Sequence, residues 1–195
     1  QARREAAERL GVNPDAPTLL VTGGSLGALH VNESMTGAAD ALPEGAQVVH
    51  LTGRGKDEPV RAAVEKAGLS DRWHVIDYLT TMEDALAVAD LVVCRSGAGT
   101  VAEMEALGLP CIYVPLPIGN GEQRLNAADH VAAGGAQLID DKDFTADFVR
   151  RNVFPLLGST RLADMAAASQ SLGRAGAARA LADLALEQVK EAGNE

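Results

Sequence analysis

Up to residue 139, short apolar runs alternate with Ala-rich segments of mixed polarity. The runs are rich in Val, Leu and Ile, and polar residues do not alternate regularly within them. Strands of this kind are apolar on both faces, as in a parallel sheet that helices cover on both sides. The pattern predicts six strands, at residues 18–22, 47–51, 73–77, 90–94, 111–115 and 136–139.

The segments between these runs predict helices, at about residues 28–41, 57–67, 81–88, 100–107 and 122–133. Beyond the last strand only helices are predicted, at about 145–156, 161–171 and 174–192, and Thr145 is a plausible N-cap for the first. Alternating strands and helices predict an α/β fold, a Rossmann-like parallel sheet of about six strands with a helical C-terminal tail. We expect one domain, with a core at about 16–140 and C-terminal helices at about 145–192.

Composition narrows the classes of partner. The 195 residues are 47% hydrophobic but only 3% aromatic, so the core must consist mainly of Ala, Val, Leu and Ile. The formal net charge of −10 argues against a nucleic-acid-binding surface, which needs clustered Lys and Arg. A phosphate bound here would be held by helix N-termini and backbone N–H groups instead.

The cysteines, the lengths of the apolar runs and the first residues of the chain predict the cellular compartment and the extent of the protein. Cys94 and Cys111 lie inside apolar runs without metal-ligand spacing, which predicts free thiols and fits a reducing cytoplasm. No segment has the ~18 uninterrupted apolar residues of a membrane span. The chain opens at Gln1 within helix-like sequence, from which we expect that an N-terminal portion precedes it.

In doubly wound sheets, ligands bind beyond the carboxyl ends of the strands. The loops to inspect follow Thr22, His50, Asp77, Cys94 and Pro115. After the first strand comes Gly23-Gly24-Ser25-Leu26-Gly27-Ala28, where the backbone can turn tightly at a helix N-terminus. A diphosphate could bind the N–H groups there, with Ser25 as a further donor. The alternative is a simple turn that needs glycine for its geometry, and the spacing is not that of a dinucleotide fingerprint.

A second glycine-rich loop, Arg95-Ser96-Gly97-Ala98-Gly99-Thr100-Val101-Ala102-Glu103, follows the fourth strand. The helix boundary at residue 100 places Thr100 and Glu103 in the first helical turn. A carboxylate there commonly stabilises the helix dipole, by roughly 0.3–1 kcal/mol. The other interpretation is that Glu103 accepts hydrogen bonds from both ribose hydroxyls of a nucleotide.

The third loop carries Gly119 and Gly121 and leads to Gln123, whose amide could bind sugar hydroxyls or simply cap a helix. Asn126 is expected to be structural. Asp141-Lys142-Asp143 spells a sequence that binds divalent metals in some glycosyltransferases, but its place after the last strand predicts a solvated turn. No metal site is expected.

Taken together, the motifs resemble the C-terminal domain of the MurG family over essentially the whole chain. The matching segments are Gly23-Gly24-Ser25-x-Gly27-Ala28, Cys94-Arg95-Ser96-Gly97-Ala98-x-Thr100-x-x-Glu103, Gly108-x-Pro110, Val114-Pro115 and Gln123-x-x-Asn126-Ala127. The resemblance implies the donor lobe of a two-lobed GT-B fold. It implies a UDP-N-acetylglucosamine site formed by Ser25, Leu79, Ala98, Gly99, Thr100, Val101, Ala102, Glu103 and Gln123, with a phosphate loop supported by Gly23, Gly24, Gly27, Ser96 and Gly97.

Within that implied site, Ser25 would contact the diphosphate, Leu79 would recognise uracil through its backbone, Glu103 would bind the ribose and Gln123 the N-acetylglucosamine. Two positions depart from the family pattern. Gly99 replaces a larger apolar residue, and Glu122 stands where some members have a second glutamine.

The resemblance further implies an inverting transferase that moves N-acetylglucosamine from UDP-N-acetylglucosamine to lipid I, making lipid II for peptidoglycan. It implies no cofactor and no metal, an acceptor bound by the missing N-terminal lobe, and a cytoplasmic location at the inner face of the membrane for the intact protein. The catalytic base would lie in the missing lobe, so this chain alone should bind donor without turnover. The alternatives are another GT-B enzyme acting on a UDP-sugar, a non-catalytic binding module, and a nicotinamide-binding domain.

Overall fold

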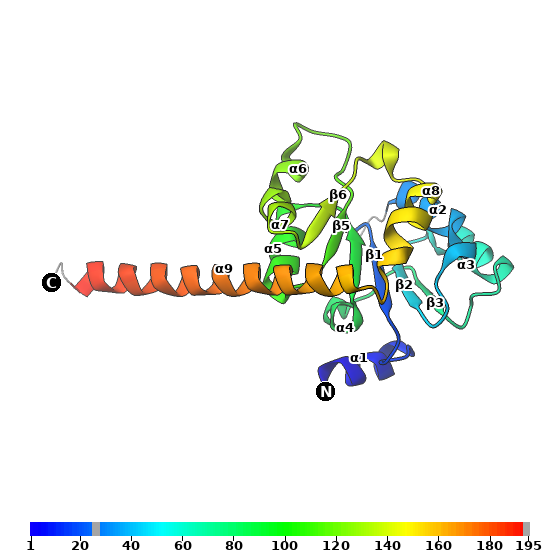
Figure 1. The fold of residues 1–195 in the computed structure, drawn as a ribbon, viewed down its shortest axis with the longest axis horizontal. Coiled ribbons are helices and arrows are strands. Elements are labelled where there is room, and N and C mark those ends of the chain that lie inside the picture. Colours follow the sequence, from blue (N-terminus) through cyan, green and yellow to red (C-terminus); the bar gives the residue numbers. More distant parts are fainter. Residues whose placement is uncertain (25–27, 193–195) are drawn as a thin grey trace.

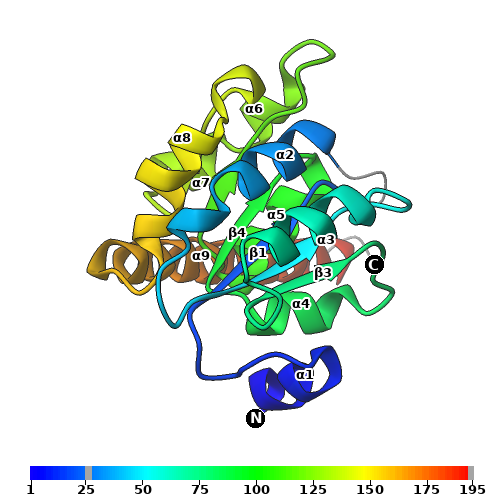
Figure 2. The ribbon, with the colours of Figure 1, turned by 90° about the vertical axis from the view of Figure 1, so that its right-hand side faces the viewer.

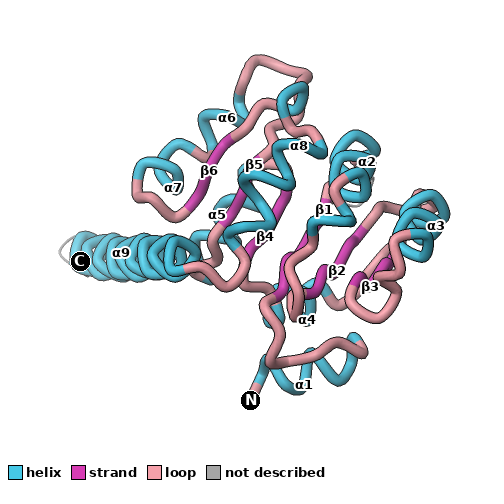
Figure 3. The backbone as a smooth tube through the Cα atoms, turned by 45° about the vertical axis from the view of Figure 1, so that its right-hand side comes forward, coloured by secondary structure: helices cyan, strands magenta, loops and turns pink. Residues whose placement is uncertain are grey.

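The computed structural model describes residues 1–24 and 28–192, and side chains through residue 187. Its six strands are β1 (Thr18–Thr22), β2 (Gln47–Leu51), β3 (Trp73–Ile76), β4 (Leu91–Cys94), β5 (Cys111–Tyr113) and β6 (Ala136–Leu138). All pairings between neighbours are parallel, in the order β3-β2-β1-β4-β5-β6. Figure 3 shows these strands side by side. The predicted doubly wound parallel sheet is confirmed.

One helix precedes the first strand, and the others lie in the connections between strands or follow the last strand (Figure 1). They are α1 (Ala2–Leu10), α2 (Leu29–Gly37), α3 (Asp57–Lys66), α4 (Met82–Val88), α5 (Ala98–Leu107), α6 (Glu122–Asn126), α7 (Ala128–Ala132), α8 (Ala146–Phe148) and α9 (Thr160–Ala192). Shorter turns are the 3₁₀ turns η1 (Ala39–Ala41), η2 (Asp141–Asp143) and η4 (Phe154–Leu156), and the π-helical turn η3 (Val149–Val153). The predicted N-cap is confirmed, since the Thr145 hydroxyl accepts a hydrogen bond from the Phe148 N–H at 3.2 Å.

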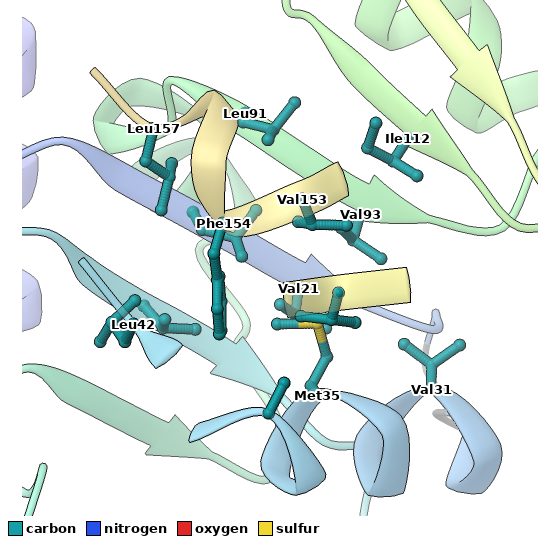
Figure 4. Packing of buried hydrophobic residues seen from close by; sticks show 14 of the residues in the cluster. Val21, Val31, Met35, Leu42, Leu91, Val93, Ile112, Val153, Phe154 and Leu157 are labelled. Atoms are coloured by element: carbon teal, nitrogen blue, oxygen red, sulfur yellow. The ribbon is translucent and has the colours of Figure 1, made fainter. Parts of the chain in front are cut away.

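The four central strands, β2, β1, β4 and β5, bury both faces because successive side chains enter two different cores. The edge strands β3 and β6 are only partly buried. In β1, Leu19 and Val21 belong to one core, and Leu20 between them belongs to the other. The first core packs against α2, α3 and the turns after α8, where Met35 and Phe154 meet the strand residues (Figure 4). The second packs against α1, α4 and α5. In Figure 2, α2 and α3 lie in front of the sheet, with α1 beside α4 below.

The C-terminal region departs from the prediction of separate helices at 161–171 and 174–192. One continuous helix, α9, covers Thr160–Ala192 and packs along α5 before projecting beyond the sheet (Figure 1). The sequence placed a break at Gly173, but that glycine serves helix packing. A Cβ atom at Gly173 would lie 2.4 Å from the carbonyl oxygen of Glu105 in α5. The missing side chain therefore lets α9 approach α5 closely.

This packing role predicts opposite effects for two glycines of the same helix. Gly173→Ala is expected to lower the free energy of unfolding by about 1–3 kcal/mol, because the methyl group must displace backbone. Gly176→Ala, whose added Cβ would meet no atom within 4 Å, is expected to raise it by about 0.5–1 kcal/mol through helix propensity. Urea unfolding of both variants checks this. Two equal effects of the same sign would contradict it.

A buried polar chain also ties α9 to the sheet. The Ser169 hydroxyl of α9 donates to the Gly135 carbonyl at 3.2 Å and lies 2.8 Å from Nε2 of His130, whose Nδ1 lies 2.9 Å from the Tyr113 hydroxyl. Because Ser169 donates to the carbonyl, it accepts from His130 Nε2–H, and Nδ1 then accepts from Tyr113. Burial lowers the pKa of His130 and raises that of Tyr113, which favours the neutral form of each group.

Candidate functional site

A crevice of about 540 Å³ lies beyond the carboxyl ends of the strands, where the strand order reverses between β1 and β4. This is the location at which doubly wound sheets bind ligands. All five of the loops selected from the sequence contribute to it. The lining residues are Thr22, Gly23, Gly24, Leu51, Gly53, Asp77, Tyr78, Leu79, Met82, Arg95, Gly97, Thr100, Glu103, Met104, Leu116 and Gln123.

The turn after β1 forms one wall of the crevice. Gly23 and Gly24 both line it, and Gly24 has φ of +82°, a conformation that favours glycine. The Gly24 N–H donates to the Thr22 hydroxyl at 3.2 Å, which fixes the start of the turn. Ser25 and Gly27, the other predicted members of this loop, lie outside the described residues.

The opposite wall is the N-terminus of α5. Gly97 is the N-cap, and the first intrahelical bond runs from the Val101 N–H to the Gly97 carbonyl at 3.0 Å. The N–H groups of residues 98–100 precede that bond, so they lack intrahelical acceptors. Together with the positive end of the helix dipole, such groups form a site for an anion. Gly97 and Thr100 line the crevice directly.

Glu103 lies two positions further into α5 than the sequence suggested. The helix begins at Ala98 and not at residue 100, because Ala98 and Gly99 are already helical. Glu103 is therefore in the second turn, and the placement in the first turn was wrong. A helix dipole acts on charges within the first turn, so this position weakens the alternative interpretation of Glu103. Its side chain is exposed and lines the crevice.

The other residues of α5 that were predicted to bind the ligand have side chains that do not line the crevice. Ala98, Gly99 and Ala102 are exposed but do not line the crevice. Val101 is buried in the second core, so its side chain packs inside the domain. Their assignment to a ligand stays a prediction.

Arg95, at the end of β4, braces this region. Its guanidinium donates to the carbonyls of Val114 and Pro115 at 3.2 and 3.3 Å and forms an ion pair with Asp141. Both charged side chains are only 16% exposed. Among the described residues that line the crevice, Arg95 alone carries a positive charge, and that charge is already paired. A phosphate would therefore depend on the backbone N–H groups.

The same ion pair corrects the expectation for Asp141-Lys142-Asp143. The prediction of a solvated turn was wrong for Asp141, because its carboxylate pairs with Arg95, which directly follows β4 and is distant in sequence. Asp140 pairs with Arg124 beside it. Within the described residues, no group of three or more His, Cys, Asp or Glu side chains could hold a metal ion.

Two side chains of α6 hold the loop between β4 and α5. The Gln123 side-chain oxygen accepts from the N–H groups of Leu116, at 2.8 Å, and Ser96, at 3.3 Å. The Asn126 amide donates to the Ser96 carbonyl at 3.0 Å. Ser96 is buried, so its side chain lies inside the domain and does not line the crevice. Asn126 has the structural role that was expected of it.

Apolar side chains line the part of the crevice that lies beyond the carboxyl ends of β2 and β3. Leu51, Leu79 and Met82 line it there. Tyr78 adds an aromatic face, 40% exposed, over which the Arg54 guanidinium lies 3.8 Å from the ring centroid. This end is suited to a flat, weakly polar group such as a nucleobase.

A buried network fixes the loop after β2. The Trp73 indole N–H donates to Nδ1 of His50 at 3.2 Å, which leaves His50 Nε2–H to donate to the Asn32 side-chain oxygen at 2.8 Å. The Asn32 amide in turn donates to the Thr52 carbonyl at 3.0 Å, next to Gly53 of the crevice. Full burial lowers the pKa of His50 to about 3, so the ring is neutral.

The sheet order and a crevice at its switch point define a doubly wound, Rossmann-like domain. The likeness to a solved MurG structure, given below, identifies it as one lobe of the GT-B type of glycosyltransferase fold. The chain belongs to the family described as the glycosyltransferase family 28 C-terminal domain, which matches residues 18–181. The resemblance to the MurG family is thereby confirmed, as the relatives below bear out.

Two relatives from bifidobacteria are named UDP-N-acetylglucosamine--N-acetylmuramyl-(pentapeptide) pyrophosphoryl-undecaprenol N-acetylglucosamine transferase. The one from Bifidobacterium adolescentis is 50% identical over 168 residues, covering 80% of this chain and 43% of the relative. The one from Bifidobacterium longum strain DJO10A is 48% identical over 195 residues, covering 92% of this chain and 49% of the relative. The chain spans about half the length of these curated relatives.

Solved structures agree with this assignment. The crystal structure of Acinetobacter baumannii MurG matches with a TM-score of 0.74 at 27% identity, over 85% of this chain and 48% of that one. A putative UDP-N-acetylglucosamine 2-epimerase from Listeria monocytogenes matches with a TM-score of 0.63 at 21% identity, over 94% and 47%. The second likeness shows only that the fold is shared.

The structure thus brings Gly23, Gly24, Leu79, Gly97, Thr100, Glu103 and Gln123 of the predicted site to one crevice. Sequence reasoning missed the brace formed by Arg95. A charged residue directly after a buried strand was the signal that could have found it. The aromatic wall at Tyr78 was also missed.

None of the helices in the part of the chain that the structure describes has the length and apolar character needed to cross a lipid bilayer.

Proposed function

We propose that this chain is the donor-binding half of an inverting glycosyltransferase. The intact enzyme would transfer N-acetylglucosamine from UDP-N-acetylglucosamine to lipid I, giving lipid II for peptidoglycan. One observation carries the proposal: the N-terminus of α5 and the Glu103 carboxylate face the same crevice at the switch point of the sheet. The names of relatives that are 48–50% identical to this chain over the aligned residues support the particular reaction.

In this proposal the donor lies along the whole length of the crevice. The uracil lies against Leu79 and Met82, and Glu103 accepts hydrogen bonds from the ribose. The diphosphate binds the free N–H groups at the start of α5 and in the turn after β1, with Ser25 as a further predicted donor. Gln123 contacts the sugar at the opposite end of the crevice from Leu79.

The chemistry follows from where negative charge develops. When the acceptor hydroxyl attacks the anomeric carbon, the bond to UDP breaks and the diphosphate gains charge. Oriented N–H groups at a helix N-terminus stabilise that charge without a metal ion. The general base that takes the acceptor proton is proposed to lie in the other lobe, together with the acceptor site. We therefore expect this chain to bind donor without turnover, and the intact enzyme to act in the cytoplasm, peripherally at the inner membrane face.

Calorimetric titration with UDP-N-acetylglucosamine, UDP-glucose and UDP tests the substrate. The expected order of affinity places UDP-N-acetylglucosamine first, because the acetamido group offers an extra hydrogen-bond partner near Gln123. Equal affinity for all three would favour another GT-B enzyme acting on a UDP-sugar, or a binding module that reads only the nucleotide.

A further inference from the structure

The carboxamide of Gln123 has a fixed orientation in the crevice. Its two hydrogen-bond partners among the described residues, the N–H groups of Leu116 and Ser96, are both donors, so the side-chain oxygen must face them. The amide nitrogen then points away from both loops. Any ligand group that meets Gln123 without disturbing these bonds must offer an acceptor oxygen.

The same oxygen joins two loops that leave different strands. Leu116 follows β5, whereas Ser96 follows β4 and comes directly before Gly97, the N-cap of α5. The Ser96 carbonyl is held as well, by the Asn126 amide at 3.0 Å. Residues 123 and 126, one helical turn apart on α6, thus hold both backbone hydrogen-bonding groups of Ser96, the residue directly before the N-cap of α5.

We infer that Gln123 is a positioning residue for the diphosphate-binding end of α5, in addition to any contact that it makes with the sugar. The inference rests on the proposed function, because it assumes that nucleotide diphosphate binds there. It predicts that UDP, which carries no sugar, depends on Gln123 for affinity. A residue that only contacts the sugar would leave UDP binding unchanged.

The physical reason is preorganisation. Without the Gln123 oxygen, the N–H groups of Ser96 and Leu116 turn to water, and the loop before α5 samples more conformations. Binding must then order that loop, which lowers affinity. The fold itself survives, because Arg95 independently links the ends of β4 and β5 through the carbonyls of Val114 and Pro115.

Three variants separate this role from a sugar contact. Gln123→Met keeps the side-chain volume but neither accepts nor donates as an amide does. Gln123→Glu keeps an oxygen that can accept from both N–H groups and loses the amide donor. Leu125→Ala shortens a 73% exposed neighbour on the same helix and serves as the control. Hydrogen exchange of the Ser96 and Leu116 amides would be measured without ligand. The affinities for UDP and for UDP-N-acetylglucosamine would be measured by titration at low and at high salt.

Gln123→Met is expected to lose amide protection at Ser96 and Leu116 and to bind UDP about three- to tenfold more weakly than the unmodified chain. Gln123→Glu is expected to retain protection and, at high salt, where repulsion of the diphosphate is screened, to bind UDP more tightly than Gln123→Met. Leu125→Ala should match the unmodified chain in both measurements.

Unchanged UDP affinity in Gln123→Met, with only the preference for the sugar nucleotide lost, would overturn the inference and leave Gln123 as a sugar contact alone. Equal UDP affinities of the methionine and glutamate variants at high salt would overturn it too. Failure of the proposed function itself looks different, because the unmodified chain would then bind no UDP.

Discussion

Glu103→Ala is expected to weaken the binding of UDP more than tenfold and to leave the domain folded. In the proposed complex, the carboxylate accepts hydrogen bonds from two ribose hydroxyls, and bonds to a charged group contribute roughly 1.5–3 kcal/mol each. A loss of 1.4 kcal/mol already corresponds to a factor of ten in affinity. Stability should change little, because Glu103 is exposed and lies beyond the first turn of α5.

Glu58→Ala is the matched control for this change. Glu58 is also an exposed helical carboxylate, but it lies in the first turn of α3 and does not line the crevice. It should leave UDP affinity unaltered, although it carries the same change in net charge. Calorimetry on both variants, with thermal unfolding alongside, checks the pair. Equal UDP affinities in the two variants would remove Glu103 from the site.

The second prediction concerns acid stability and His50. Burial holds the pKa of its ring at about 3, against an ordinary value of 6.5. The unfolded chain therefore takes up a proton as the pH falls through 6.5, while the folded chain does not. The stability that the neutral His50 ring contributes is fully present above pH 6.5 and is lost progressively as the pH falls toward 3. Between pH 7 and pH 5, His50 alone should lower the free energy of unfolding by about 2 kcal/mol.

Urea unfolding at both pH values, for the unmodified chain and for His50→Gln, tests this. The glutamine variant is expected to be less stable at pH 7, because it cannot reproduce the bonds to Trp73 and Asn32. Its stability should nevertheless fall less steeply with acid. Burial also lowers the pKa of His74 and His130, so some acid dependence remains in the variant. Identical losses in the two proteins would contradict the assignment to His50.

The strands were predictable because their signal is local. An apolar run such as residues 18–22 needs cover on both faces, and its position in the sequence does not depend on distant residues. Its partners do, since β1 pairs with β4 about 70 residues later, and the strand order was not predicted. The C-terminal helices were less predictable. Gly173 is read from sequence as a helix break, and only the position of the Glu105 carbonyl in α5 explains why glycine is required there.

The site was predictable where backbone geometry alone determines it. The glycines at 23, 24 and 97 and the carboxylate at 103 stand at fixed positions after strands, so the topology brings them together. Contacts between loops could not be found this way. The Arg95–Asp141 pair joins residues 46 positions apart, and the Gln123 bond to Ser96 joins residues 27 apart. The resemblance to a family assigned Gln123 to the sugar, but the sequence contained no signal of its structural bonds.

Titration of the unmodified chain with UDP, with and without magnesium and against NAD as a competitor, tests the central claim most directly. We expect UDP to bind in both conditions, because the N–H groups of α5 supply the diphosphate contacts, and we expect NAD not to displace it. Displacement of UDP by NAD, or binding that requires magnesium, would contradict a metal-free nucleotide-sugar site in this crevice.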